Sequence, residues 1–139
     1  MRIRKQSVTK DSNTPARPQV LHIEDDLSVA RSISRALRVN GYEVVSVATG
    51  DEAIQCIENG FRPSLILTDF HLGLGLCAGD EVVTAIATLL RFKPPVILLT
   101  GSPSRHIGAV KSFADRLLAK PVDIDVLLRE IENLLRVPR

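Results

Sequence analysis

The sequence contains few aromatic residues, only two cysteines and no long apolar run. With no Trp, one Tyr and 4% aromatic residues in all, its core must be built from aliphatic side chains. Cys56 and Cys77 form no Cys-x-x-Cys pattern, so we expect two reduced thiols and no disulfide framework. No apolar run approaches the ~20 residues of a membrane span, and no apolar signal segment follows the N-terminal Met. These absences predict a cytoplasmic protein with no membrane segment.

Net charge is also small, because the formal charges of the 139 residues sum to only +2. Residues 1–17 hold five basic residues against Asp11 alone, a net charge of +4, so the remaining residues sum to −2. A slightly acidic folded part argues against a nucleic-acid-binding domain. Residues 1–18 contain two prolines and no apolar periodicity, and we predict a basic disordered tail or linker. A nucleic-acid-binding arm is the alternative, but no aromatic residues are interleaved with the basic ones.

Short apolar segments alternate with amphipathic segments over residues 19–137, which we predict to form one folded domain. The expected strands are Gln19–Ile23, Tyr42–Val47, Leu65–Asp69, Val96–Leu99 and Arg116–Ala119. The expected helices are Leu27–Asn40, Asp51–Asn59, Asp80–Leu90, Pro103–Phe113 and Asp123–Val137. Strands that alternate with helices in this way predict an α/β fold whose parallel sheet is covered on both faces.

The most informative strand is the third, which ends in a single carboxylate. Leu65 to Thr68 are apolar or β-branched, which is typical of a strand with both faces covered. A carboxylate in the middle of such a strand would be strongly destabilised by desolvation, whereas Asp69 at the C-terminal tip can reach water. Open parallel α/β sheets bind ligands beyond the carboxyl ends of their strands. Asp69 is therefore the central candidate site residue.

Three consecutive acids, Glu24, Asp25 and Asp26, follow the first predicted strand. Their mutual repulsion is relieved if a hard cation such as Mg²⁺ binds, because carboxylate oxygens are its preferred ligands. Asp26 could instead be the N-cap of the helix that follows. Both interpretations hold together if Glu24 and Asp25 face the metal and Asp26 begins the helix.

The fourth and fifth predicted strands are also followed by polar residues, Thr100 and Lys120. A hydroxyl beside Gly101 at a strand tip is suited to hydrogen-bonding an anion, although the segment could also be a plain turn. Lys120 precedes Pro121, which favours an extended backbone and a fixed side-chain direction. The alternative is an ordinary surface lysine.

These strand tips meet if the sheet has the doubly wound order 2-1-3-4-5, because the first and third strands then flank the topological switch point. Such a crevice is suited to phosphoryl transfer. Asp69 would attack phosphorus as a nucleophile and form an acyl phosphate. Mg²⁺ held by Glu24, Asp25 and Asp69 would offset the charge of the transferring group. Lys120 and Thr100 would hold its equatorial oxygens.

Four of these segments, together with the second strand, resemble the receiver domain of two-component response regulators. The matching segments are Val20–Asp26, Gly41–Val45 with Ala48–Gly50, Leu65–Asp69, Val96–Gly101 and Leu118–Pro121. Each motif is short, but their order and spacing are specific, and the resemblance covers about residues 19–135. It implies a flavodoxin-like, three-layered fold with a five-stranded parallel sheet in the order 2-1-3-4-5.

The resemblance also implies a function. Asp69 would take a phosphoryl group from a sensor histidine kinase or a histidine phosphotransfer protein. Asp69, Thr100 and Lys120 would be the catalytic residues. The chain would be a signalling domain that catalyses its own phosphorylation and dephosphorylation, rather than an enzyme that acts on a separate substrate.

The metal ligands are implied by the resemblance as well. Asp25 and Asp69 would bind Mg²⁺ directly, and Glu24 would act mainly through water. The backbone carbonyl of His71 would complete the protein ligands.

Three positions depart from the family pattern. Gly73 stands where the family usually has Pro, and Gly79 comes ten residues after the phosphoacceptor rather than eight. The loop is therefore longer and richer in glycine, and it resembles loops in receivers of hybrid histidine kinases. Leu117 replaces the Tyr or Phe that usually lies three residues before the Lys, and it cannot reproduce the ring movement that reports phosphorylation.

Two other functions fit the sequence less well. A protein-interaction module that is never phosphorylated would not need the complete set of acids, hydroxyl and lysine. A flavodoxin-like small-molecule binder or enzyme would carry a glycine-rich phosphate loop after its first strand, where this chain has three acids. No effector segment follows Arg139, which leaves open a stand-alone regulator or a piece of a longer protein. We expect a monomer or a weak dimer.

Overall fold

A computed structural model describes residues 17–69, 79–108 and 112–136. The predicted tail over residues 1–18 lies almost wholly outside the described residues, so the boundary between tail and domain stays a prediction. Most of the loop after Asp69 also lies outside them, and with it His71, Gly73 and Cys77.

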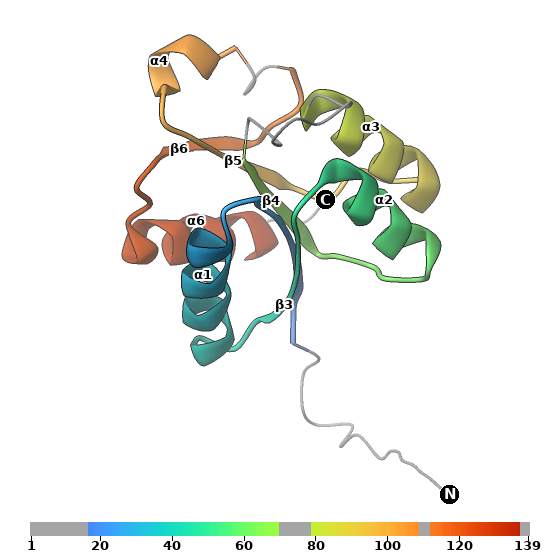
Figure 1. The fold of residues 1–139 in the computed structure, drawn as a ribbon, viewed down its shortest axis with the longest axis horizontal. Helices are drawn as coiled ribbons and strands as arrows, with labels where there is room; N and C mark the ends of the chain where they lie inside the picture. Colours follow the sequence, from blue (N-terminus) through green and yellow to red (C-terminus); the bar gives the residue numbers. More distant parts are fainter. Residues whose placement is uncertain (1–16, 70–78, 109–111, 137–139) are drawn as a thin grey trace, which may run out of the picture.

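Five parallel strands form the sheet of the described chain (Figure 1). They are β2 (Gln19–Ile23), β3 (Glu43–Val47), β4 (Leu65–Asp69), β5 (Val96–Thr100) and β6 (Arg116–Ala119). Their order across the sheet is β3-β2-β4-β5-β6, and every neighbouring pair is parallel. Counted along the chain this is the order 2-1-3-4-5, so the predicted doubly wound, flavodoxin-like fold is confirmed.

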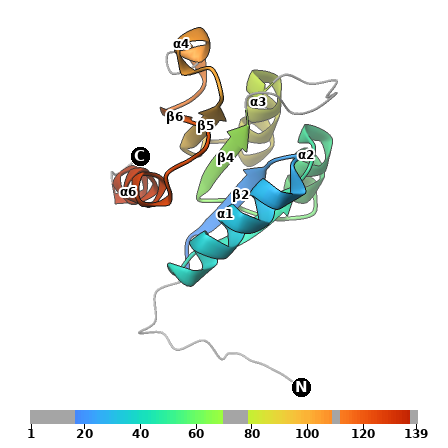
Figure 2. The same ribbon diagram turned by 60° about the vertical axis from the view of Figure 1, so that its left-hand side comes forward.

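Helices cover both faces of the sheet, which gives the three predicted layers (Figure 2). One face carries α1 (Leu27–Val39) and α6 (Ile124–Arg136), and the other carries α2 (Gly50–Glu58) and α3 (Gly79–Leu90). Two clusters of buried aliphatic side chains fill the spaces between the layers. Side chains alternate along β2, so that Leu21 and Ile23 belong to the α2–α3 cluster and Val20 to the α1–α6 cluster. No helix in the described ranges is both long and apolar enough to cross a membrane.

The sequence of each strand matches its place in the sheet. β4 and β5 lie in the interior of the sheet, and all of their residues are buried. This is why they read as unbroken apolar runs rather than as alternating ones. β3 lies at an edge, and its mixed pattern leaves Glu43 and Ser46 exposed. The predicted order 2-1-3-4-5 places the second strand at an edge, and β3 lies there.

Side-chain caps fix where the helices begin. Asp26 Oδ1 accepts hydrogen bonds from the backbone N–H groups of Ser28 at 2.9 Å and Val29 at 3.2 Å. Asp26 is therefore the N-cap of α1, as one of the two interpretations of the acidic run predicts. Thr49 and Glu52 form a reciprocal capping box at the start of α2.

The helix expected over Pro103–Phe113 is confirmed at its start but is interrupted within its described part. α4 spans only Pro103–His106, and Ile107 and Gly108 form a turn after it. Ile107, an apolar residue of the expected helix, is 66% exposed. Gly108 disfavours a helix, and a single helical turn buries too little apolar surface to stabilise an extension.

Candidate functional site

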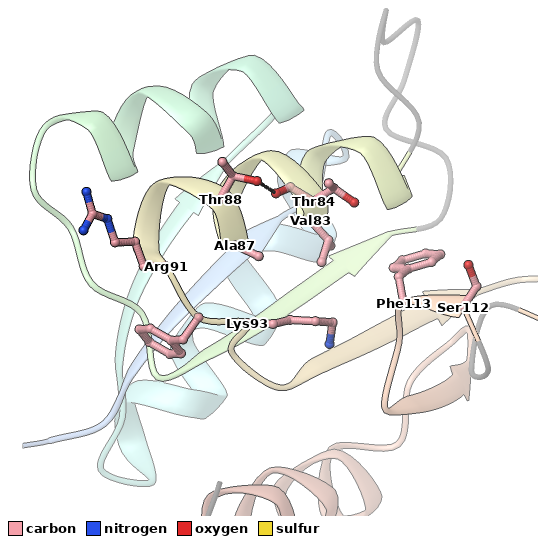
Figure 3. A pocket seen from close by; sticks show the side chains of 9 residues that line it. Val83, Thr84, Ala87, Thr88, Arg91, Lys93, Ser112 and Phe113 are labelled. Atoms are coloured by element: carbon pink, nitrogen blue, oxygen red, sulfur yellow. Dashed lines mark hydrogen bonds between the residues drawn. The ribbon is translucent and has the colours of Figure 1, made fainter.

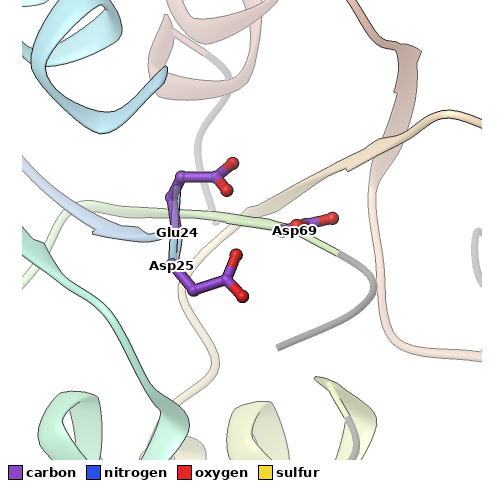
Figure 4. Close-up of side chains that lie close together, drawn as sticks. All are labelled: Glu24, Asp25 and Asp69. Atoms are coloured by element: carbon purple, nitrogen blue, oxygen red, sulfur yellow. The ribbon is translucent and has the colours of Figure 1, made fainter. Parts of the chain in front are cut away.

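The polar ends of β2 and β4 meet at the carboxyl edge of the sheet (Figure 4). Glu24 and Asp25 follow β2, Asp69 ends the neighbouring β4, and one carboxylate oxygen from each lies within 4.8 Å of the others. Glu24 is 2% exposed and Asp69 is 9% exposed, whereas Asp25 is open to solvent. These three residues are called the acid cluster below. Glu24 and Asp69 form its buried part, and Asp25 faces solvent.

Glu24 is the buried member of the acid cluster, and both of its carboxylate oxygens accept hydrogen bonds. Oε1 accepts from Lys120 Nζ at 3.0 Å, and Oε2 accepts from the backbone N–H of Asp26 at 3.1 Å. These contacts occupy lone pairs that a metal ligand would need. Of the three acids, Glu24 is therefore the least suited to contact a cation directly.

Lys120 brings a positive charge to the acid cluster from the far side of β5. It follows β6, which β5 separates from β4, yet its Nζ lies 3.1 Å from Asp69 Oδ2. Its backbone N–H donates to the carbonyl oxygen of Thr100 at 2.8 Å, which holds the ends of β5 and β6 together. With ion pairs to both Asp69 and Glu24, Lys120 is not the ordinary surface lysine of the alternative interpretation.

Thr100 ends β5, between the tips of β4 and β6, and is 1% exposed. Its Oγ1 accepts a hydrogen bond from the backbone N–H of Ser102 at 2.9 Å, which closes the turn after the strand. A hydroxyl can accept and donate at the same time, so this turn is compatible with the predicted contact to an anion.

Burial and charge shift the pKa values of the groups around the acid cluster. Burial raises the pKa of Glu24 above its ordinary value of 4.5; Lys120 opposes this shift and Asp69 adds to it. Burial alone would lower the pKa of Lys120, but its hydrogen bonds to Glu24 and Asp69, together with their charges, outweigh burial and raise it. One ammonium is therefore shared by two carboxylates. Lys120 stays charged, but its charge does not fully offset the effect of burial on Glu24.

The donor chemistry of the acid cluster fits a hard divalent cation. Three carboxylates and one ammonium carry formal charges that sum to −2, and carboxylate oxygens are the ligands that Mg²⁺ prefers. A cation would also supply the positive charge that the buried Glu24 lacks. Asp25 and Asp69 are the members placed to contact it directly, since both oxygens of Glu24 already accept hydrogen bonds.

His22, a buried polar residue on β2, is absent from the predicted site. It is 0% exposed, and neither of its ring nitrogens has a hydrogen-bond partner among the described residues. Burial, with a further contribution from Lys120, lowers the pKa of His22 to about 4, so its ring is neutral near pH 7. A histidine inside an otherwise apolar buried strand is the sequence signal that could have identified it.

The structure brings the predicted site residues that it describes to one edge of the sheet. Glu24, Asp25, Asp69, Thr100 and Lys120 all lie at the C-terminal ends of strands. His71 lies outside the described residues, so its predicted role as a carbonyl ligand stays a prediction.

A separate groove of about 330 Å³ lies between α3 and the segment that leads into β6 (Figure 3). Its lining consists of Val83, Thr84, Ala87, Thr88, Arg91, Phe92, Lys93, Ser112 and Phe113. This lining contains no carboxylate, so the groove offers no counterpart of Asp69. The acid cluster is the better candidate for a site of chemistry.

A family model described as "Response regulator receiver domain" matches residues 20–132. The chain belongs to this family. The predicted resemblance is thereby confirmed, and with it the place of this receiver among the proteins of two-component systems.

Curated relatives of this receiver include the transcriptional regulatory protein PrrA of Mycobacterium tuberculosis, which is 31% identical over 120 residues. Response regulator MprA of Mycobacterium leprae is 30% identical over 129 residues. The two matches cover 86% and 85% of this chain but only 50% and 51% of the relatives. The receiver therefore spans about half the length of the curated relatives it matches.

Solved receiver structures share the fold. The receiver domain of the Francisella response regulator 1452 has a TM-score of 0.74 and 28% identity, over 86% of this chain and 98% of its own. The chemotaxis response regulator CheY4 of Vibrio cholerae has a TM-score of 0.72 and 27% identity, over 86% of this chain and 99% of its own. The matched part of this chain therefore spans almost the full length of both solved chains.

Proposed function

We propose that this receiver accepts a phosphoryl group on Asp69 in a Mg²⁺-dependent reaction and signals through the conformational change that follows. The placement of Asp69 carries the proposal. Asp69 is the last residue of an interior strand, and its carboxylate lies 3.1 Å from Lys120 Nζ. It also has an oxygen within 4.8 Å of a carboxylate oxygen of Glu24 and of Asp25. A nucleophile, a cation and metal-binding acids at one open edge of the sheet are the parts that aspartyl phosphorylation needs.

The donor is a phosphohistidine of a sensor histidine kinase or of a histidine phosphotransfer protein, which is the type of partner expected for this family. An oxygen of Asp69 forms a bond to phosphorus while the phosphorus–nitrogen bond of the donor breaks. The departing imidazole takes up a proton from solvent. The products are an acyl phosphate on Asp69 and an unmodified histidine on the donor. On this proposal the receiver catalyses its own modification in the cytoplasm, with the partner's phosphohistidine as the donor.

Lys120 and Thr100 act on the transferring group. The ammonium of Lys120, already beside Asp69, stabilises the negative charge of the phosphoryl oxygens. The Thr100 hydroxyl, between the tips of β4 and β6, donates a hydrogen bond to one of them.

The acid cluster holds the metal on this proposal. Asp25 and Asp69 are the direct ligands, Glu24 acts mainly through water, and the carbonyl of His71 is the remaining protein ligand. Bound Mg²⁺ supplies positive charge that offsets the charge of the incoming phosphoryl group.

Intact-mass measurement after incubation with Mg²⁺ and acetyl phosphate tests the proposed function. The wild-type receiver should gain the mass of one phosphoryl group, and Asp69→Asn should gain none. Asp51→Asn is the matched control, because Asp51 is an exposed acid at the start of α2 and should not be needed. Asp25→Ala should be modified much more slowly and should need more Mg²⁺. An unmodified wild-type protein would instead favour an interaction module that is never phosphorylated.

A further inference from the structure

A hollow of about 200 Å³ lies between α1 and the edge of the sheet formed by β3. Its lining includes Glu24, Leu27, Arg31, Ser34, Arg38 and Ser46. We propose that this hollow, called the α1 pocket below, binds a small molecule through an oxyanion group, either a carboxylate or a phosphate. The proposal makes no use of Asp69 or of its phosphorylation, although Glu24 belongs to both the α1 pocket and the acid cluster.

Two arginines and a serine line the α1 pocket from one stripe of α1. Arg31, Ser34 and Arg38 are spaced by three and four residues, which places their side chains on the same side of a helix. Arg38 Nη2 donates a hydrogen bond to the carbonyl oxygen of Val44 at 3.0 Å, which holds the guanidinium against the edge strand. Neither arginine forms an ion pair with another described residue, so both charges are available to a ligand.

Ser34 gives the α1 pocket a buried polar group without a partner. The residue is 3% exposed, and its Oγ has no hydrogen-bond partner among the described residues. An unpaired buried hydroxyl destabilises a fold unless something in the site satisfies it. Ser34 therefore keeps hydrogen-bonding capacity that a ligand of the pocket can use.

His22 adds a second buried group of this kind on the same face of the sheet. It pairs in register with Ser46, which lines the α1 pocket, and residues in register point to the same face. Both ring nitrogens of His22 lack a partner among the described residues. Nearly every buried polar atom of a folded protein is paired. His22 does not itself line the α1 pocket, so Ser34 is the exception that points to a polar ligand there.

The hydrogen-bond donors in the lining of the α1 pocket outnumber the free acceptors, which favours a negatively charged ligand. Glu24 is the one carboxylate in its lining, and both oxygens of Glu24 already accept hydrogen bonds from Lys120 and Asp26. The other polar groups, two guanidinium groups and the hydroxyls of Ser34 and Ser46, can all donate. Guanidinium groups bind carboxylates and phosphates through paired hydrogen bonds. At ~30 Å³ for each water, the hollow has room for such a group and a few waters.

Backbone-amide NMR of the labelled receiver, freed of divalent ions on a chelating resin, tests the proposal. Potassium phosphate, potassium acetate and potassium chloride are titrated separately at equal ionic strength. We expect phosphate or acetate to cause saturable shifts in residues 31–38 and 44–48, and chloride to cause none that saturate. Saturation by phosphate alone would identify a phosphate group as the ligand, and saturation by acetate would identify a carboxylate. Shifts that never saturate, or that centre on Asp69 and Lys120, would overturn the proposal.

Arginine variants separate a built site from general attraction to positive charge. The double variant Arg31→Gln with Arg38→Gln removes both guanidinium groups from the α1 pocket. Arg35→Gln is the matched control, because Arg35 is exposed on the same helix and does not line the pocket. We expect the double variant to bind at least about tenfold more weakly and the control to bind like the wild type. A loss in Arg35→Gln equal to that in the double variant would overturn the proposal.

Ser34→Ala provides a second test in case the arginine variants fold poorly. Without added anion the substitution removes an unpaired buried hydroxyl, so the Tm should not fall. At a saturating concentration of the bound anion, the variant should gain less Tm than the wild type gains. An equal gain would show that the anion does not meet Ser34 and would contradict the proposed site.

Discussion

Lys120 Nζ lies 3.1 Å from Asp69 Oδ2 and 3.0 Å from Glu24 Oε1, so one ammonium joins carboxylates at the ends of two neighbouring strands. It reaches both from β6, across the intervening β5. The same cation therefore offsets the charge of the buried Glu24 and faces the proposed phosphoacceptor. The charge balance at this edge of the sheet depends on how one lysine is shared between these acids.

Replacing Lys120 with Met should separate its two roles, because the substitution keeps most of the side-chain length and removes the charge. We expect the initial rate of phosphorylation by acetyl phosphate, followed by intact mass, to fall about 10²-fold or more. Lys93→Met is the control: Lys93 forms an ion pair with Asp115, and neither residue belongs to the acid cluster. A rate like that of the wild type in Lys120→Met would show that Lys120 only neutralises Glu24.

Burial of Glu24 predicts how stability depends on pH when divalent cations are absent. Because burial raises the folded-state pKa, the stability that Glu24 contributes is complete below its ordinary value of 4.5 and is lost as pH rises through the raised value. The Tm of the wild type should therefore fall relative to that of Glu24→Gln as pH rises above the ordinary pKa of 4.5. Differential scanning fluorimetry of both proteins measures this difference.

Magnesium supplies the control for that measurement. At the upper end of the pH range, added Mg²⁺ should raise the Tm of the wild type more than that of Glu24→Gln, since it offsets the charge of the ionised carboxylate. A difference in Tm that stays constant across the pH range would mean that Lys120 compensates Glu24 completely.

The contact between α2 and α3 predicts a stability effect far from any chemistry. Gly50, the first residue of α2, lies against Val82 of α3, and a Cβ at position 50 would overlap Val82 Cγ2. Gly50→Ala should therefore reduce the free energy of unfolding in urea by about 1–3 kcal/mol through overpacking. A Cβ at Gly101 would meet no described atom within 4 Å, so Gly101→Ala serves as the control. Equal unfolding midpoints for the wild type and Gly50→Ala would show that the two helices can move apart freely.

The position of Leu117 predicts where phosphorylation is reported. Leu117 is half-buried and packs against the cluster on the α2–α3 side. A leucine has no aromatic ring whose rotation could report phosphorylation. We expect the signal to pass through the turn after Thr100 and through α4, a single helical turn with low local stability. Hydrogen exchange measured by mass spectrometry should change on phosphorylation in residues 100–108 and little in α6. The largest change in residues 124–136 would place the output on α6 instead.

The strand ends could be predicted from the sequence because each buried apolar run stops at a polar residue. Asp69 and Thr100 mark the ends of β4 and β5 in this way. Parallel strands bring such ends to one edge of the sheet, so the approximate location of the site follows from the pattern alone.

The contacts between side chains could not be predicted in the same way. The reach of Lys120 to Glu24 depends on strand order and side-chain direction, which no local pattern encodes. Ser34 follows the buried Ile33 in α1, and the rotation of the packed helix decides whether a serine there faces the sheet or water. The error at α4 is similar, because apolar residues such as Ile107 form a helix only where a surface is available to bury them.

Borohydride reduction of the phosphorylated receiver, followed by peptide sequencing in the mass spectrometer, tests the central claim most directly. An acyl phosphate on an aspartate is reduced to homoserine, which marks the modified position. The proposed function predicts homoserine at position 69 after treatment with Mg²⁺ and acetyl phosphate, and none in protein treated without Mg²⁺. Homoserine at Asp25 or Asp26, or a phosphoryl group that resists reduction because it is carried by a histidine, would contradict the assignment of Asp69.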